Sequence, residues 1–238
     1  MGPMFSAAAQ EVTLQAGDVP LPGSLCRPQA ATGLVLFVHG SASSRFSSRN
    51  RFVAERLQRD GLATLLFDLL SEAEERIDRR DRSLRFDIPL LARRTVAALD
   101  AVDQEPALRS LPVGLFGAST GAAAALIAAT VRPGRVAAVV SRGGRPDLAA
   151  SALPRVACPT LLIVGGRDEA VLALNREAAA QMTAPHRLAI VPGATHLFEE
   201  PGTLAQAADL AAAWFGSQLS ASPPAPGGGD RRPGGAPR

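Results

Sequence analysis

The sequence predicts an α/β protein with a mostly parallel central sheet that is covered by helices on both faces. Short continuous apolar runs alternate along the chain with longer segments in which apolar residues recur at helical spacing. Such runs are typical of parallel strands buried on both faces, and strands that alternate with helices build sheets of this kind. With 238 residues and 47% hydrophobic content, the chain can form one large domain with a substantial core.

The first strands are expected to form an antiparallel hairpin, in which Glu11–Leu14 and Val19–Cys26 flank Gly17 and Asp18. The later strands are apolar runs bounded by glycine, proline or polar residues. We expect them at Leu34–His39, Leu62–Phe67, Val113–Phe116, Val136–Val140, Thr160–Val164 and Arg187–Val191. Helices are expected between them at Asn50–Asp60, Ile88–Val102, Val171–Met182 and Thr203–Leu219, with one more after Gly121.

The most charged stretch, Ser71–Arg85, is predicted to be one solvated helix. Ser71 and Glu74 have the spacing of a capping box, and acidic residues precede basic residues by four positions. The pairs are Glu72/Arg76, Glu75/Arg79, Asp78/Arg82 and Asp81/Arg85. The alternative is a mobile cover over the functional site, because the segment interrupts a strand-to-helix connection.

The domain is expected to span residues 11–220, between a flexible N-terminus at 1–10 and a disordered Pro/Gly/Arg-rich tail at 221–238. The net charge is only +3 and every basic residue is arginine, so the basic pI does not indicate a nucleic-acid partner. The chain shows no signal-peptide pattern and no uninterrupted apolar stretch of about 18 residues, which predicts no membrane association. Cys26 and Cys158 do not make a disulfide framework, so we expect a cytoplasmic location.

The chain is organised around the pentapeptide Gly117-Ala118-Ser119-Thr120-Gly121, which joins an expected strand to an expected helix. A serine on a sharp strand-to-helix turn has the pattern of a nucleophile elbow. The turn strains the serine backbone, and a Cβ on either flanking glycine would collide with the neighbouring strand or helix. The Ser119 hydroxyl is then exposed beside a helix N-terminus, which favours negative charge.

Two further residues are expected beside Ser119, because the carboxyl ends of parallel strands converge on one crevice. Asp168 and His196 each follow a late strand. The order Ser119, Asp168, His196 suits nucleophilic catalysis, in which the imidazole accepts the serine proton and the carboxylate holds the imidazole tautomer. Asp147, in the loop after an earlier strand, remains an alternative for the acid.

The other histidines and Asp68 are expected to have structural roles. His186 precedes its strand and therefore belongs to the opposite end of the sheet. His39 lies in a strand-end turn, where we expect it to pack and to bond loop backbone. His39 and the adjacent Gly40 nevertheless stay among the candidate substrate contacts, because they reach the same crevice.

An oxyanion that forms on an attacked carbonyl needs hydrogen-bond donors, which we expect from the backbone N–H groups of Ser41 and Thr120. Gly40 lets the backbone turn so that the Ser41 N–H aims at the site.

Arg142 and Arg145 follow a strand end and are candidates to clamp a substrate carboxylate. The alternative for these arginines is an ion pair with Asp147 or a role in capping backbone groups.

Five segments between Val12 and Leu219 carry a family resemblance: LVLFVHGS, GLATLLFDLL, GASTG, VGGRD and PGATHLFEEPG. Together they resemble the dienelactone hydrolase-like branch of the α/β-hydrolase superfamily. The resemblance implies the α/β-hydrolase fold, with Ser119, Asp168 and His196 as the triad and with Ser41 and Thr120 as oxyanion donors. Dienelactone hydrolases proper carry cysteine as the nucleophile, so the serine points to an esterase on the same scaffold. Relatives of this kind also occur fused to phosphoribosyltransferases, of which this sequence shows no segment.

The residues and the resemblance together predict a hydrolase that cleaves a small carboxylic ester or lactone through an acyl–Ser119 intermediate. No cofactor and no metal is expected, because His, Cys and Asp do not cluster at ligand spacing. The partner is therefore a small-molecule substrate, and the protein is expected to be a monomer or homodimer. The alternatives are a catalytically silent scaffold that acts as an interaction module, and an acyltransferase or perhydrolase that uses the same triad. A nucleotide-binding sheet is excluded because the glycines do not match a phosphate-binding pattern.

Overall fold

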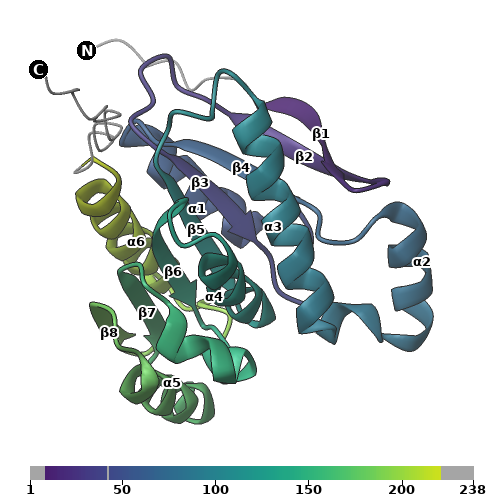
Figure 1. The fold of residues 1–238 in the computed structure, drawn as a ribbon. Helices are drawn as coiled ribbons and strands as arrows, with labels where there is room; N and C mark the ends of the chain where they lie inside the picture. The colour runs from purple at the N-terminus through teal and green to yellow at the C-terminus, as the bar shows by residue number, and fades with distance from the viewer. Residues whose placement is uncertain (1–8, 42, 221–238) are drawn as a thin grey trace, which may run out of the picture.

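A computed structural model describes residues 9–41 and 43–220, which form one eight-stranded sheet flanked by helices (Figure 1). The strands are β1 Gln10–Ala16, β2 Val19–Cys26, β3 Leu34–Val38, β4 Ala63–Phe67, β5 Val113–Ala118, β6 Val136–Arg142, β7 Thr160–Gly165 and β8 His186–Val191. Their order in the sheet is β1-β2-β4-β3-β5-β6-β7-β8. β3 to β8 are parallel, whereas β2 is antiparallel to both β1 and β4. The predicted fold class, including the N-terminal hairpin, is confirmed.

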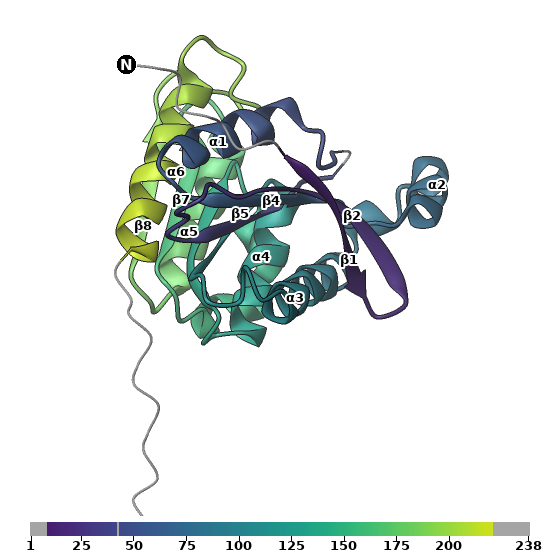
Figure 2. The same ribbon diagram turned by 90° about the horizontal axis from the view of Figure 1, so that it is seen from above.

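Helices cover both faces of the sheet (Figure 2). α1 Ser48–Arg59 and α6 Thr203–Leu219 pack together on one face. The other face carries α3 Ile88–Gln104, α4 Thr120–Val131, α5 Glu169–Gln181 and the 3-10 segment η2 Pro146–Arg155. α2 Glu72–Asp81 and the short η1 Leu84–Phe86 lie outside these layers, and α2 projects away from the sheet (Figures 1 and 2).

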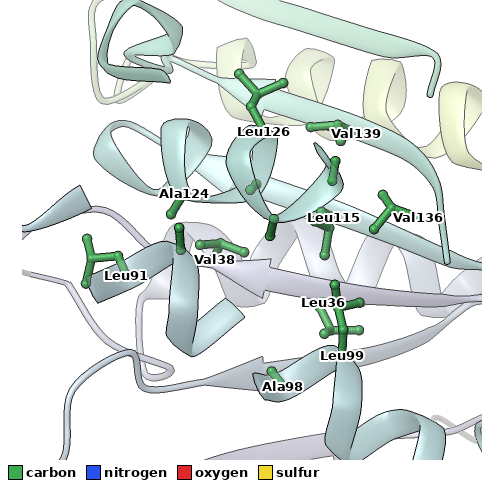
Figure 3. Close-up of a cluster of buried hydrophobic side chains, with 14 of the residues drawn as sticks. Leu36, Val38, Leu91, Ala98, Leu99, Leu115, Ala124, Leu126, Val136 and Val139 are labelled. Atoms are coloured by element: carbon green, nitrogen blue, oxygen red, sulfur yellow. The ribbon is translucent and has the colours of Figure 1, made fainter. Parts of the chain in front are cut away.

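The core under α3 and α4 positions the start of α4. Leu36 and Leu115 lie on adjacent central strands, and Leu99 and Leu126 from α3 and α4 belong to the same cluster (Figure 3). α4 has the sequence TGAAAALIAATV and is buried on almost all sides, because its alanines allow close approach to the sheet and to neighbouring helices. The N-terminus of α4 is therefore fixed against the carboxyl ends of β3 and β5.

The prediction of a single helix over 71–85 was wrong. The capping box of Ser71 and Glu74 is present, but α2 ends at Arg82, which adopts a left-handed φ of 59°. The reason is the buried carboxylate of Asp78, which accepts hydrogen bonds from the backbone N–H groups of Leu84 and Arg85 and from the Arg85 side chain. These bonds turn the chain back on itself. Within the described part of the chain, none of the four expected pairs at four-residue spacing forms an ion pair.

The expected flexible N-terminus and disordered tail fall outside the described residues, except for residues 9 and 10. Gln10 is the first residue of β1. Across residues 9–41 and 43–220, every helix is too short or too polar to cross a bilayer.

Candidate active site

Ser119 occupies the sharp turn between β5 and α4. Its backbone has a φ of 50°, in the left-handed region that residues with a side chain rarely adopt. A Cβ on Gly117 would collide with Ala122, and a Cβ on Gly121 would collide with the backbone carbonyl of Val38. The elbow is also tied to β6, because the Ser119 N–H donates to the carbonyl of Arg142 over 3.3 Å. The sequence around Ser119 therefore folds locally as the glycine spacing predicts.

Asp168 and His196 come together from the loops after β7 and β8. His196 Nδ1 lies 2.7 Å from Asp168 Oδ2, so the ring donates Nδ1–H to the carboxylate and its Nε2 is left as the base. The Asp168 side chain is 14% exposed and the His196 side chain 38% exposed. The carboxylate thus lies behind the ring, on the side away from solvent.

The histidine loop is held by two residues that sequence analysis did not assign. The Glu200 carboxylate accepts a hydrogen bond from the N–H of Thr195 over 3.0 Å. Phe198 is buried with a positive φ of 56°, which turns the chain directly after His196. The signal for both was present in PGATHLFEEPG, where a phenylalanine and a glutamate follow the histidine two and four positions later.

Ser119 and His196 line the same cavity, which has a volume of about 240 Å³. Its wall also includes Gly40, Ser41, Arg49, Asn50 and Arg142. The structure therefore brings together the three predicted triad residues, with Asp168 behind His196. Arg49 and Asn50 were missed, since nothing in the sequence places the first turn of α1 beside the elbow.

The residues of the two expected oxyanion donors contact each other, and Ser41 lines this cavity. Thr120 is the first residue of α4, and the Ser41 N–H donates to its side-chain Oγ1 over 2.9 Å. A Cβ on Gly40 would lie 2.9 Å from the carbonyl oxygen of Ala118, so only glycine allows the β3 loop this close to the elbow. The loop is thereby fixed against the N-terminus of α4.

His39 uses both ring nitrogens on backbone groups. Nδ1 lies 3.0 Å from the carbonyl oxygen of Gly40, and Nε2 accepts a hydrogen bond from the N–H of Leu69 over 3.1 Å. Burial lowers the pKa of this imidazole, so the ring stays neutral. His39 therefore organises the loop, while His186 is exposed at the opposite end of the sheet.

Two aspartates at this end of the sheet are already engaged by arginines. Asp68 bonds both the side chain and the backbone N–H of Arg45, over 2.5 and 2.7 Å. Asp147 accepts two hydrogen bonds from Arg145, of 2.9 and 2.8 Å. These contacts match the loop-organising role expected for Asp68 and leave Asp147 facing an arginine rather than His196.

Arg142 differs from its neighbour Arg145. Its guanidinium carbon lies over the rings of Phe116 and Phe198, 5.9 and 5.8 Å from their centroids. Nη2 donates to the amide oxygen of Asn50 over 3.3 Å, whereas Nη1 is buried without a hydrogen-bond partner among the residues described. Burial, and repulsion by Arg49, lower the pKa of Arg142 to about 10, so it remains charged at neutral pH.

No group of three or more His, Cys, Asp or Glu side chains within residues 9–41 and 43–220 is arranged to hold a metal ion.

Comparison with known proteins identifies the relatives of this chain. The model of the dienelactone hydrolase family matches residues 23–217. A dienelactone hydrolase from Anabaena variabilis has 57% sequence identity and a TM-score of 0.89, over 90% of this chain and 100% of that one. Est1E from Butyrivibrio proteoclasticus, at 15% identity over 88% of this chain and 99% of its own, shares the fold with a TM-score of 0.74.

In Mycobacterium tuberculosis, a protein named "Putative phosphoribosyl transferase" is 56% identical over 206 residues. The match covers 87% of this chain but 46% of that protein, so the chain spans about half the length of the curated relatives it matches.

The parallel sheet and the strained serine elbow define the protein as an α/β hydrolase. Within that class, the chain belongs to the dienelactone hydrolase family, because the family model matches most of its length. The predicted family is confirmed.

Proposed function

We propose that this protein hydrolyses a carboxylic ester or lactone through an acyl–Ser119 intermediate. The observation that carries the proposal is the 2.7 Å bond between His196 and Asp168, beside a serine with a φ of 50° in the same cavity. A serine hydroxyl is a weak nucleophile at neutral pH, and a neighbouring imidazole oriented by a carboxylate activates it. The name of the Anabaena relative, dienelactone hydrolase, supports a lactone or ester as the substrate class.

In the first half of the reaction, Ser119 Oγ attacks the acyl carbonyl while His196 Nε2 accepts the hydroxyl proton. The Nδ1–H···Asp168 hydrogen bond stabilises the imidazolium that forms. The tetrahedral intermediate then collapses, the C–O bond to the leaving alcohol breaks, and His196 returns the proton to that oxygen. In a lactone the leaving oxygen stays attached to the acyl chain, so this step opens the ring.

In the second half, water attacks the acyl–Ser119 ester and gives a proton to His196. Collapse of the second tetrahedral intermediate releases the carboxylic acid and returns the proton to Ser119 Oγ. Both intermediates carry an oxyanion, for which the N–H groups of Ser41 and Thr120 are the proposed donors. Losing one such donor typically lowers the turnover rate about 10²–10³-fold.

We further propose that Arg142 binds a carboxylate of the substrate. A buried guanidinium without a counterion is unfavourable, and this one lies close to Arg49 and to the N-terminus of α1, which also carry positive charge. Arg49 is itself paired with Glu199 at 3.5 Å, so one positive charge is left unbalanced. A single carboxylate balances it. The cavity volume of about 240 Å³ favours a small substrate.

The triad is tested by fluorophosphonate labelling followed by intact and peptide mass measurement. We expect one adduct per wild-type chain, on Ser119, and little or none on His196→Ala under the same conditions. His186→Ala is the matched control, because its imidazole is exposed at the other end of the sheet and should leave labelling unchanged. A folded wild-type protein that takes no label would contradict the proposal and favour a catalytically silent scaffold.

A further inference from the structure

The side-chain hydroxyl of Thr120 lies at the junction of the two proposed oxyanion donors. Thr120 begins α4 and is 4% exposed, and its Oγ1 accepts the 2.9 Å hydrogen bond from the Ser41 N–H. The backbone N–H of Thr120 is the other proposed donor. The Thr120 side chain therefore bonds the first proposed donor, the Ser41 N–H, and belongs to the same residue as the second, the Thr120 N–H.

The position of the hydroxyl relates it to the proposed oxyanion through the two donor nitrogens. An oxyanion held by both N–H groups lies about 2.7–3.1 Å from each nitrogen. Thr120 Oγ1 is 2.9 Å from the Ser41 nitrogen and only three covalent bonds from its own backbone nitrogen. An oxyanion that contacts both nitrogens would therefore have the same two nitrogen neighbours as Oγ1.

The hydroxyl has a hydrogen to donate. Its bond with Ser41 uses an oxygen lone pair, which leaves the O–H free to point elsewhere. In the part of the chain that the structure describes, we find no acceptor for this hydrogen. A hydroxyl that already accepts one hydrogen bond is polarised and becomes a better donor.

We propose that the Thr120 hydroxyl is a third hydrogen-bond donor to the oxyanion, beside the N–H groups of Ser41 and Thr120. This inference rests on the acyl-transfer function proposed above. As negative charge develops on the carbonyl oxygen, the O–H turns toward it, and the Ser41 N–H is shared between Oγ1 and the oxyanion. Because the neutral carbonyl attracts the hydroxyl far less, the contact acts on turnover more than on substrate binding.

The opposite interpretation makes the hydroxyl a competitor. If Thr120 Oγ1 occupies the Ser41 N–H and thereby keeps it from the oxyanion, removing the hydroxyl should speed the reaction. The two interpretations therefore predict changes of opposite sign for the same substitution.

The experiment compares Thr120→Val, which keeps the shape and loses the hydroxyl, with Thr120→Ser, which keeps the hydroxyl. With p-nitrophenyl acetate as the probe, we expect Thr120→Val to lower kcat about 10–100-fold with KM changed by less than about threefold. Thr120→Ser should stay within about threefold of wild type in both constants. The control is Thr160→Val, which removes another buried hydroxyl at the far end of β7. That hydroxyl donates to the carbonyl of Cys158 over 3.2 Å, and its loss should leave kcat unchanged.

An unchanged or higher kcat in Thr120→Val would overturn the inference, as would a Thr120→Ser variant as slow as Thr120→Val. Thr120→Ala supplies the same comparison if valine disturbs the start of α4. Failure here is distinguishable from failure of the proposed function. If only the inference about Thr120 fails, the wild-type enzyme still labels at Ser119 and turns over. If the proposed function fails, the wild-type protein does neither.

Discussion

Two cavities share the loop after β3, and they differ in how their charged groups are paired. The cavity beside α2, of about 400 Å³, is lined by Asp68 and Asp78, whose carboxylates are bonded to arginines, and by Glu75 and Arg79, which form no ion pair among the described residues. The two aspartates contrast with the charged group of the second cavity. The cavity beside Ser119, of about 240 Å³, contains Arg142, which pairs with no carboxylate among the residues described. Charges that pair within the chain hold its loops in place, whereas an unpaired buried charge is available to a ligand.

The same contrast separates two arginines that lie three positions apart in the sequence. Arg145 is bonded to Asp147 through two nitrogens, so a clamp on a substrate carboxylate would have to displace that partner. The Arg142 side chain has only the neutral Asn50 side chain as a hydrogen-bond partner within the described chain. Residue type alone therefore does not distinguish the two arginines, whereas the presence or absence of an acidic partner does.

The largest expected effect is a loss of turnover that separates Asp168, which bonds His196, from Asp147, which bonds Arg145. Asp168→Asn should lower kcat on p-nitrophenyl acetate by about 10⁴-fold, because the amide no longer holds the His196 tautomer or stabilises the imidazolium. Asp147→Asn should stay within a few-fold of wild type. Comparable losses in both variants would show that the two carboxylates do not have the separate roles described here.

A smaller effect is expected at the two arginines, measured with monomethyl and dimethyl succinate as a charged and a neutral ester. Arg142→Met should lower kcat/KM for the charged ester about 10–100-fold, the range expected for a lost charge-assisted hydrogen bond. The neutral ester should change little, and Arg145→Met should alter the two esters equally. If Arg142→Met affects both esters alike, the arginine serves the fold and does not select the substrate.

In the α2 cavity, the expected effect is on stability. Asp78→Asn should lower the free energy of unfolding by roughly 1–3 kcal/mol, since a 2% exposed carboxylate loses its ion pair with Arg85. Urea unfolding measures the loss, and turnover of a neutral ester should be nearly unchanged. Lost turnover in a protein of wild-type stability would mean that this cavity also serves the reaction.

The smallest effect concerns pH and His39. Burial lowers the pKa of His39, so the unfolded chain binds a proton more readily than the folded one below about pH 6.5. The contribution of neutral His39 to the free energy of unfolding is therefore fully present above that pH. It declines as pH falls, by up to about 1.4 kcal/mol at about pH 5.5. Urea unfolding at about pH 8 and pH 5.5 should show a larger acid loss for wild type than for His39→Gln. Equal losses would mean that His39 does not titrate on unfolding.

Local sequence determined the strands, most helices and the nucleophile elbow. These features depend on neighbours in the chain: continuous apolar runs specify buried strands, and glycines at 117 and 121 allow the strained turn at Ser119. The order of Ser119, Asp168 and His196 along alternating strands and helices was enough to bring them to one end of the sheet, because parallel strands share a carboxyl edge.

Only the tertiary structure decided which polar groups are left without partners. Asp78 pairs with Arg85 across a helix end, and Arg142 meets Asn50 and Arg49 from α1, contacts that no local spacing predicts. The Ser41 N–H reaches the Thr120 hydroxyl across 79 residues of sequence. Such contacts depend on how loops from different strands pack, and that packing determines which charged side chains find an acidic or basic partner.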